Sequence, residues 1–228
     1  MGYLKEAGIT TLALDIDGTL YSRVQLNTRM VRSLFPSITL SRAFNWTRKE
    51  IRRVQDEEPL PNENRAGFLD RQAALVASRY KKDINTVKEM INRQFYQAWE
   101  DSFKTITPFA HLRQTLEQVK NEGVQIILFS DFPIADKPAT LGIADLIDGA
   151  FCSEESGYLK PSPKAFSYLL EKSGGSPSTT LYIGDSYDKD CIGAAAAGLH
   201  SWYLGRKKGL GRAAQKSFTS WAEIQRFI

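Results

Sequence analysis

The hydrophobic residues in the first and last parts of the chain gather in short, unbroken runs. The first run is TTLALDI over residues 10–16, further runs cover 124–130, 180–183 and 200–204, and a weaker one lies at 148–152. Short apolar runs bounded by turn residues are typical of strands that are buried on both faces, as in parallel sheets. We therefore predict a parallel β-strand at each run.

Helical patterns occupy the intervals between these runs. We expect helices from Thr107-Pro108 to about Glu122, near 134–141, from Ser162-Pro163 to about Lys172, over 188–197, and after Ser220 with Glu223 in the first turn. A Ser or Thr followed by Pro is a common helix start, and a glycine such as Gly123 is a common helix end. Strands that alternate with helices imply an α/β protein with a Rossmann-like parallel sheet and helices on both faces.

The long segment between the first two strands has a different character. Residues 21–104 contain no convincing strand, and their best helical pattern covers 84–99. Thr86 and Glu89 have the spacing of a capping box at the start of this helix. Its apolar face is formed by residues at helical spacing: Ile84, Val87, Ile91, Phe95, Ala98 and Trp99.

A second helix is predicted at 41–54, and Pro, Asn and Gly make 59–67 a loop. Trp46 and Trp99 are expected in the core of this segment. We therefore predict an all-helical domain, 21–104, inserted after the first strand of an α/β domain that comprises 1–20 and 105–228.

Composition and charge narrow the range of functions. The chain has 228 residues, of which 42% are hydrophobic and 25% charged, and a net charge of +4. This basic excess is mild and spread along the chain, so we expect no nucleic-acid partner.

No apolar stretch is long enough for a membrane span, and we expect a soluble, cytoplasmic protein. Cys152 and Cys191 are expected to be buried free thiols in a reducing compartment.

Polar residues that can perform chemistry follow the predicted strands at their carboxyl ends, where parallel sheets bind ligands. They are Asp15, Asp17, Gly18 and Thr19 after the first strand, Ser130 and Asp131 after the second, Lys160 after the weak one, and Asp185, Asp188 and Asp190 after TLYI. Each alone could be a turn former, a helix cap or a surface lysine. Together, carboxylates at one edge repel each other, and a bound cation is the natural compensation.

These residues resemble the motifs of the haloacid dehalogenase superfamily in its phosphatase form. The D-x-D-G-T motif is present at 15–19, followed in family order by Ser130, Lys160, and Gly184-Asp185 with Asp190. Asp188 is not assigned to the site. The resemblance covers the α/β domain, whereas the inserted segment resembles the family's helical cap in position and secondary structure only.

The resemblance implies a phosphomonoester hydrolase that acts on a small phosphorylated metabolite through an aspartyl-phosphate intermediate. Asp15 would be the nucleophile, and Asp17 would protonate the leaving oxygen and then activate water. Lys160 would offset charge between the nucleophile and the phosphoryl group. Ser130 and the amide of Asp131 would donate hydrogen bonds to phosphoryl oxygens.

The same resemblance implies a Mg²⁺ cofactor. Its ligands would be Asp15, Asp185 and the backbone carbonyl of Asp17, all of them the oxygen donors that Mg²⁺ prefers. Asp190 would orient the site or bind a water of the metal.

Several alternatives stay open at this point. Asp17 favours phosphate chemistry over dehalogenation, which needs no second acid, but a sugar-phosphate mutase would use the same residue. A non-catalytic regulatory protein on this fold is a further alternative. A dehydrogenase is disfavoured because no G-x-G-x-x-G motif follows the first strand. The substrate is not specified; Arg23, Asn62, Asn64 and Arg65 are candidate loop residues for selectivity.

Overall fold

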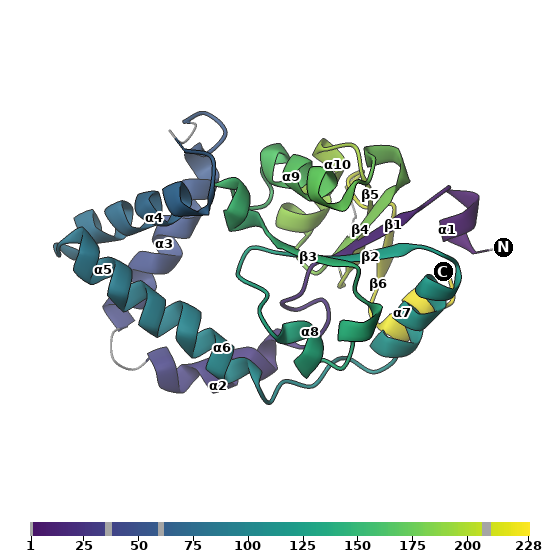
Figure 1. Ribbon diagram of the computed structural model, residues 1–228, viewed down its shortest axis with the longest axis horizontal. Coiled ribbons are helices and arrows are strands. Elements are labelled where there is room, and N and C mark those ends of the chain that lie inside the picture. The colour runs from purple at the N-terminus through teal and green to yellow at the C-terminus, as the bar shows by residue number, and fades with distance from the viewer. Residues whose placement is uncertain (1, 35–37, 59–61, 207–210) are drawn as a thin grey trace.

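A six-stranded, fully parallel sheet forms the centre of the α/β part of the protein (Figure 1). The computed structural model describes residues 2–34, 38–58, 62–206 and 211–228. The strands are β1 (Thr11–Leu14), β2 (Gln125–Ser130), β3 (Gly149–Cys152), β4 (Thr180–Gly184), β5 (His200–Leu204) and β6 (Lys216–Phe218), in the order β3-β2-β1-β4-β5-β6. The five predicted strands and their parallel arrangement are confirmed, and the edge strand β6 is an addition.

Helices cover both faces of this sheet, as predicted. Leu12 and Leu14 of β1 belong to a hydrophobic cluster with α7 (Leu112–Asn121) and α11 (Trp221–Gln225). Ala13, which points the other way, belongs to a cluster with α9 (Pro163–Ser173) and α10 (Ile192–Ala196). In Figure 1, α9 and α10 lie above the sheet and α7 lies below it. Because successive side chains of a strand alternate between faces, two covered faces require an unbroken apolar run.

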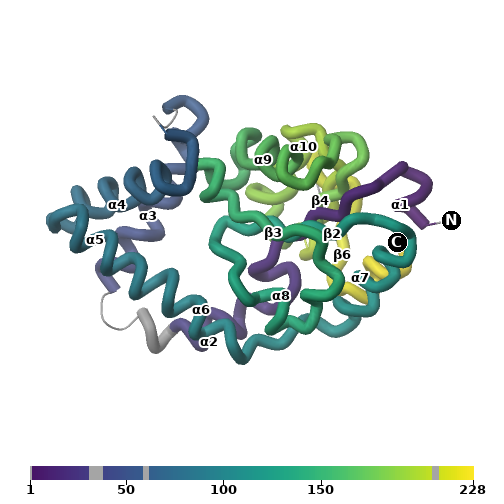
Figure 2. Tube along the Cα trace, in the orientation of Figure 1, coloured from purple at the N-terminus to yellow at the C-terminus, as the bar shows by residue number. Residues whose placement is uncertain are grey.

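Between residues 23 and 103, the described part of the chain forms helices that are connected by short turns and loops. It contains α2 (Arg23–Leu34), α3 (Ile38–Val54), α4 (Arg65–Tyr80), α5 (Ile84–Ile91), the π-helical η1 (Asn92–Gln97) and α6 (Ala98–Phe103). These helices lie at the end of the molecule opposite the two termini (Figure 2). They have a hydrophobic cluster of their own, which includes Phe44, Val76, Val87, Ile91 and Phe95. The division into two domains at 20/21 and 104/105 stays a prediction.

The remaining elements are short. They are α1 (Tyr3–Glu6), α8 (Lys137–Thr140), η2 (Ala144–Leu146), η3 (Ser153–Ser156), η4 (Pro177–Thr179) and the π-helical η5 (Tyr187–Cys191). The helix predicted over 188–197 therefore begins with a π-helical turn, and the one near 134–141 is limited to four residues. Cys152 and Cys191 are both buried, and neither forms a disulfide bond within the described residues. No helix in the described part of the chain has the length and apolar character needed to cross a membrane.

Two predicted helix starts were wrong. The helix expected at Thr107-Pro108 begins only at Leu112, after His111 in a left-handed conformation with φ 64°. Thr107 instead bonds the side chain of Gln25, so this stretch connects the two parts of the chain. The helix at 84–91 is capped by Asp83, whose carboxylate accepts from the amide of Thr86, and not by Thr86 itself.

Some predictions of burial and loops in the inserted segment were also wrong. Trp46 is 37% exposed, with the guanidinium of Arg79 4.4 Å from its ring centroid, and Ile84 is 46% exposed. Arg23 and Arg65 are the first residues of helices and do not lie in loops. Within the loop predicted at 59–67, residues 59–61 lie outside the described residues.

Candidate active site

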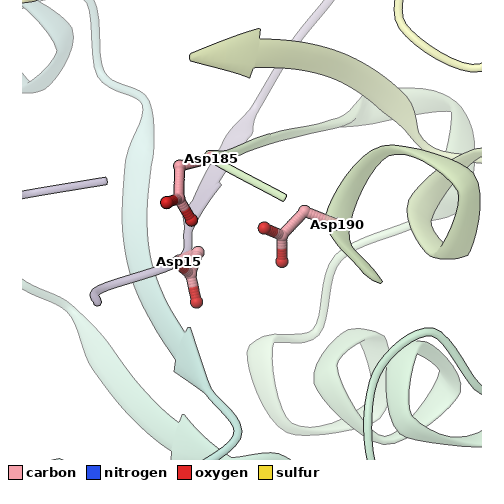
Figure 3. A group of neighbouring side chains, drawn as sticks. All are labelled: Asp15, Asp185 and Asp190. Carbon is pink, nitrogen blue, oxygen red and sulfur yellow. The ribbon is translucent and has the colours of Figure 1, made fainter. Parts of the chain in front are cut away.

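The predicted functional residues meet at the carboxyl edge of the sheet. Asp15 follows β1, Ser130 ends β2, and Asp185 follows β4 directly, so parallel pairing of these neighbouring strands brings the three together. Carboxylate oxygens of Asp15, Asp185 and Asp190 lie within 4.8 Å of one another. Figure 3 shows these three carboxyl groups around a common space.

Lys160 is the buried cation that joins two of these carboxylates. Its ammonium group lies 2.7 Å from Asp15 Oδ1, 2.7 Å from Asp190 Oδ1 and 2.8 Å from the hydroxyl of Tyr182. Burial alone would lower the pKa of Lys160, but the charges of Asp15 and Asp190 raise it well above its usual value. The lysine is therefore charged at neutral pH. It holds Asp15 in place, and Thr19 donates to the second oxygen of Asp15 at 3.1 Å.

Asp17 lies beside this group in a different electrostatic environment. Its Oδ1 accepts from the ammonium of Lys137 at 3.0 Å and from the hydroxyl of Tyr21 at 2.5 Å, and its Oδ2 is 3.4 Å from Ser130 Oγ. Burial would raise the pKa of Asp17, but Lys137 and Tyr21 outweigh it, and the pKa is lowered. Asp17 is thus ionised in this arrangement.

Asp185 is partly accessible to solvent, and its pKa is strongly raised. Burial, and next the charge of Asp15, raise its pKa to about 7, although Arg23 acts in the opposite direction. Arg23 Nη2 donates to Asp185 Oδ1 at 2.8 Å, and Arg23 Nε donates to the carbonyl of Asp17 at 2.6 Å. The guanidinium therefore bridges two of the oxygens that the sequence predicts as metal ligands.

Asp131 does not point into this cluster. Its Oδ1 accepts from Ser153 Oγ at 2.8 Å and from the amide of Lys160 at 3.0 Å, and its Oδ2 lies 2.8 Å from Arg52 of α3. Despite burial, Arg52 and Lys160 hold the pKa of Asp131 well below its usual range. The Asp131 side chain thus positions the backbone of Lys160 and connects it to the inserted helices.

Three partners of the site were not found from the sequence: Lys137, Tyr21 and Tyr182. Lys137 and Tyr21 are bound to Asp17, and Tyr182 is bound to Lys160. Tyr182 is the one with a local signal, because it lies in the TLYI run two residues before Gly184-Asp185. The loop candidates Asn62, Asn64 and Arg65 make no hydrogen bond to the carboxylates of Asp15, Asp17, Asp185 or Asp190 among the described contacts; Asn64 instead caps α4.

Comparison with known proteins identifies the class to which this fold and site belong. Residues 9–198 match the family model for hydrolases of the haloacid dehalogenase-like type. The chain therefore belongs to the family of haloacid dehalogenase-like hydrolases.

Its relatives include named phosphatases. It is 26% identical over 210 residues to a phosphoglycolate phosphatase of Aliivibrio fischeri, covering 86% of this chain and 84% of that protein. It is 32% identical over 97 residues to a glyceraldehyde 3-phosphate phosphatase of Methanocaldococcus jannaschii, covering 41% and 42%. A haloacid dehalogenase-like hydrolase domain-containing protein 3 of Bos taurus is 25% identical over 148 residues, covering 57% and 59%. The chain spans about half the length of several of these curated relatives.

Solved structures share the whole fold. A 2-haloacid dehalogenase from Pseudomonas syringae superimposes with a TM-score of 0.63 at 19% identity, covering 96% of this chain and 97% of that chain. A predicted phosphoglycolate phosphatase from Haemophilus somnus gives 0.61 at 20% identity with the same coverage. At these identities the likeness concerns the fold alone.

Proposed function

We propose that this protein is a Mg²⁺-dependent phosphomonoester hydrolase that acts on a small phosphorylated metabolite through an aspartyl phosphate on Asp15. The observation that carries the proposal is the juxtaposition of Asp15, held by Lys160, with the independent carboxylate of Asp17 and the acidic group of Asp185 and Asp190. Named phosphatases among the relatives support phosphate esters as substrates. The presence of Asp17 also supports phosphate esters as substrates, because an ester oxygen needs a proton when it leaves whereas a halide does not.

In the first step, a carboxylate oxygen of Asp15 bonds to phosphorus while the bond from phosphorus to the ester oxygen breaks. The leaving oxygen takes a proton from Asp17. In the second step, Asp17 takes a proton from water, the water oxygen bonds to phosphorus, and the acyl-phosphate bond breaks to release phosphate. Lys160 is placed to offset the negative charge that gathers around Asp15.

The first step requires a proton on Asp17, whereas Lys137 holds Asp17 ionised in the ligand-free protein. A bound phosphate group brings negative charge beside Asp17 and Ser130. Such a charge raises the pKa of a neighbouring carboxyl group. Substrate binding would thus favour the protonated form of Asp17, and Lys137 would favour its return to the ionised form that activates water.

The donor set fits a magnesium ion. The carboxylates of Asp15 and Asp185 and the carbonyl of Asp17 are hard oxygen ligands. When bound, a divalent cation would neutralise charge on the nucleophile and on the phosphoryl oxygens. The guanidinium of Arg23 already bridges Asp17 and Asp185, so a positive charge is accommodated at this place. Arg23 would have to leave these oxygens when the metal binds.

Residues 21–104 would act as a cap over the site. Arg52 of α3 donates to Asp131 and to the carbonyl of Lys160, so the inserted helices lie at the carboxyl edge and not at the opposite edge of the sheet. The two segments that connect the cap to the α/β domain lie side by side, because Gln25 bonds Thr107 and Arg29 bonds Thr105. Rotation near 21–24 and 104–107 would open and close the site.

The test is phosphate release from a panel of phosphate monoesters in Mg²⁺, in excess EDTA, and after Mg²⁺ is restored. We expect release with Mg²⁺, none with EDTA, and full recovery. Absence of release from every ester would contradict hydrolysis. Undiminished activity in EDTA would contradict the metal assignment alone.

A further inference from the structure

A cavity of about 580 Å³ lies between the inserted helices and two segments of the α/β domain, the loop after β2 and the π-helical η5 after β4. Its walls come from α2, α3, η1 and α6 on one side and from the loop after β2 and η5 on the other. The lining residues are Asn27, Met30, Phe44, Asn45, Arg48, Lys49, Arg52, Phe95, Trp99, Phe132 and Lys189.

This cavity adjoins the proposed phosphoryl site. Phe132 lies two residues after Ser130, and its amide donates to Ser130 Oγ at 3.2 Å. Lys189 directly precedes Asp190 in the chain. A phosphate group held at Ser130 and Asp15 would therefore direct the rest of its ester toward the cavity.

One part of the wall is aromatic. The ring centroid of Phe132 is 4.2 Å from that of Trp99, and Phe44 stacks on Phe95 at 4.0 Å. Phe132 is half-buried, and the guanidinium of Arg48 lies 4.0 Å from its centroid. Phe44 and Phe95 are only 3% and 4% exposed, so Trp99 and Phe132 supply most of the aromatic surface that could pack against a flat, apolar ligand.

The charged part of the wall is entirely basic. Four of its residues are cations, and among the described lining residues none is acidic. Arg48 and Arg52 are already paired, with Glu154 and Asp131 respectively. Lys49 and Lys189 have no ion pair within the described parts of the chain. A single lysine of this kind is usually just solvated. Two such lysines beside one cavity whose lining contains no carboxylate produce an electrostatic field that attracts an anion.

We propose that this cavity binds the leaving group of the substrate and selects esters whose flat, apolar body carries a second anionic group. The inference rests on the proposed function, since it takes the phosphate to lie at Asp15. The aromatic wall would hold the body, and Lys49, assisted by Lys189, would pair with the second anion, a carboxylate or a second phosphate.

Binding of non-hydrolysable probes tests this inference without requiring turnover. Calorimetry in Mg²⁺ compares 4-carboxybenzylphosphonate with its amide, 4-carbamoylbenzylphosphonate, which has the same shape but lacks the second charge. We expect the carboxylate probe to bind about tenfold more tightly, as a charge-assisted hydrogen bond would provide. 3-Carboxypropylphosphonate, which has no ring, should bind more weakly than the aromatic carboxylate.

Variants locate the source of the preference. Lys49→Gln should remove most of the advantage of the carboxylate over the amide. Lys120→Gln, which removes a partly exposed lysine paired with Asp148 far from the cavity, should leave the ratio unchanged. Equal affinities for carboxylate and amide, or a preference that survives Lys49→Gln, would overturn the assignment of the second anion. If the ring-free probe bound as tightly as the aromatic carboxylate, the inferred preference for a flat body would be wrong.

Phosphate release from the full panel of phosphate monoesters, which includes 4-nitrophenyl phosphate and esters with a second anionic group, reports on the proposed function separately. Turnover with equal probe affinities would contradict the cavity inference alone. Probe discrimination without turnover would support the cavity and contradict hydrolysis.

Discussion

Two groups of buried charges lie at the carboxyl edge of the sheet, and they are built differently. Where α3 meets the α/β domain, each carboxylate is paired with a guanidinium: Arg48 lies 2.6 Å from Glu154, which Arg65 also approaches at 3.6 Å, and Arg52 lies 2.8 Å from Asp131. In the strand-end cluster, the ammonium of Lys160 is shared between two carboxylates of a group of three.

The difference separates a structural role from a chemical one. Paired buried charges position elements, and the loss of one partner leaves the other charge uncompensated. Burial, together with the charges of neighbouring carboxylates, raises the pKa of Asp15 and of Asp185, so ionisation of the whole cluster is unfavourable by itself. Such a cluster is expected where a cation or a reaction supplies the compensation. Removing a charge should therefore lower stability where α3 meets the α/β domain and lower activity in the strand-end cluster.

The largest effect is expected for Asp15→Asn. An amide is a poor nucleophile and a weaker metal ligand, so turnover should fall by about 10⁴-fold or more. Stability should change little, because Lys160 keeps Asp190 as a partner and one of the mutually repelling carboxylates is gone. Phosphate release and urea unfolding measure the two quantities. Turnover within tenfold of the native protein would contradict the role of Asp15.

Glu154→Gln should show the opposite pattern. It leaves the buried Arg48 without its carboxylate, which should lower the free energy of unfolding by about 3 kcal/mol. Turnover per folded molecule should stay within a few-fold, because Glu154 contacts none of the strand-end carboxylates. Glu58→Gln, which breaks an exposed pair with Arg71, is the matched control and should have no measurable effect on unfolding. Equal unfolding curves for both variants would remove the distinction between the two regions.

Arg23→Ala should have the smallest effect, because it alters the strand-end cluster without removing a carboxylate. Because Arg23 occupies the oxygens of Asp17 and Asp185, its removal should strengthen Mg²⁺ binding several-fold, up to about tenfold. Calorimetric titration with Mg²⁺ in the absence of substrate gives the affinity directly. Arg29→Ala, a change in the same helix that affects a bond to Thr105, should not alter it. Weaker Mg²⁺ binding by Arg23→Ala would mean that the guanidinium assists the metal site and does not compete with it.

The sequence predicted the central strands well for a physical reason. Both faces of β1, β2 and β4 are covered, so their apolar runs are unbroken and their carboxyl ends are easily located. β6 was missed because Lys216–Phe218 is a three-residue edge strand without such a run. The start of α7 was misplaced because Thr107 and Pro108 resemble a helix start locally, whereas Thr107 is bound by Gln25, a residue 82 positions earlier.

The candidate site was predictable only as far as its residues follow strands. Asp15, Asp17, Ser130 and Asp185 have that position. Lys160 and Asp190 follow their strands at a greater distance, and the structure brings all six together. Lys137 reaches Asp17 across 120 positions, and the sequence of its short helix, although it predicts the helix, does not indicate this contact. The position of Arg23 on the proposed metal ligands depends on the chain turning back after β1, which residue spacing does not reveal.

The central claim, an aspartyl phosphate on Asp15, is tested most directly with the variant Asp17→Asn and 4-nitrophenyl phosphate. This variant keeps the nucleophile and the backbone carbonyl of residue 17 but lacks the general acid and base. Nitrophenolate leaves without a proton, so phosphorylation of Asp15 should proceed while hydrolysis of the acyl phosphate is slow. We predict a burst of nitrophenol close to one equivalent of enzyme, little turnover afterwards, and a phosphoryl mass on the peptide that contains Asp15. Steady turnover like that of the native protein would contradict the role of Asp17, and a phosphoryl group on Ser130 would contradict Asp15 as the nucleophile.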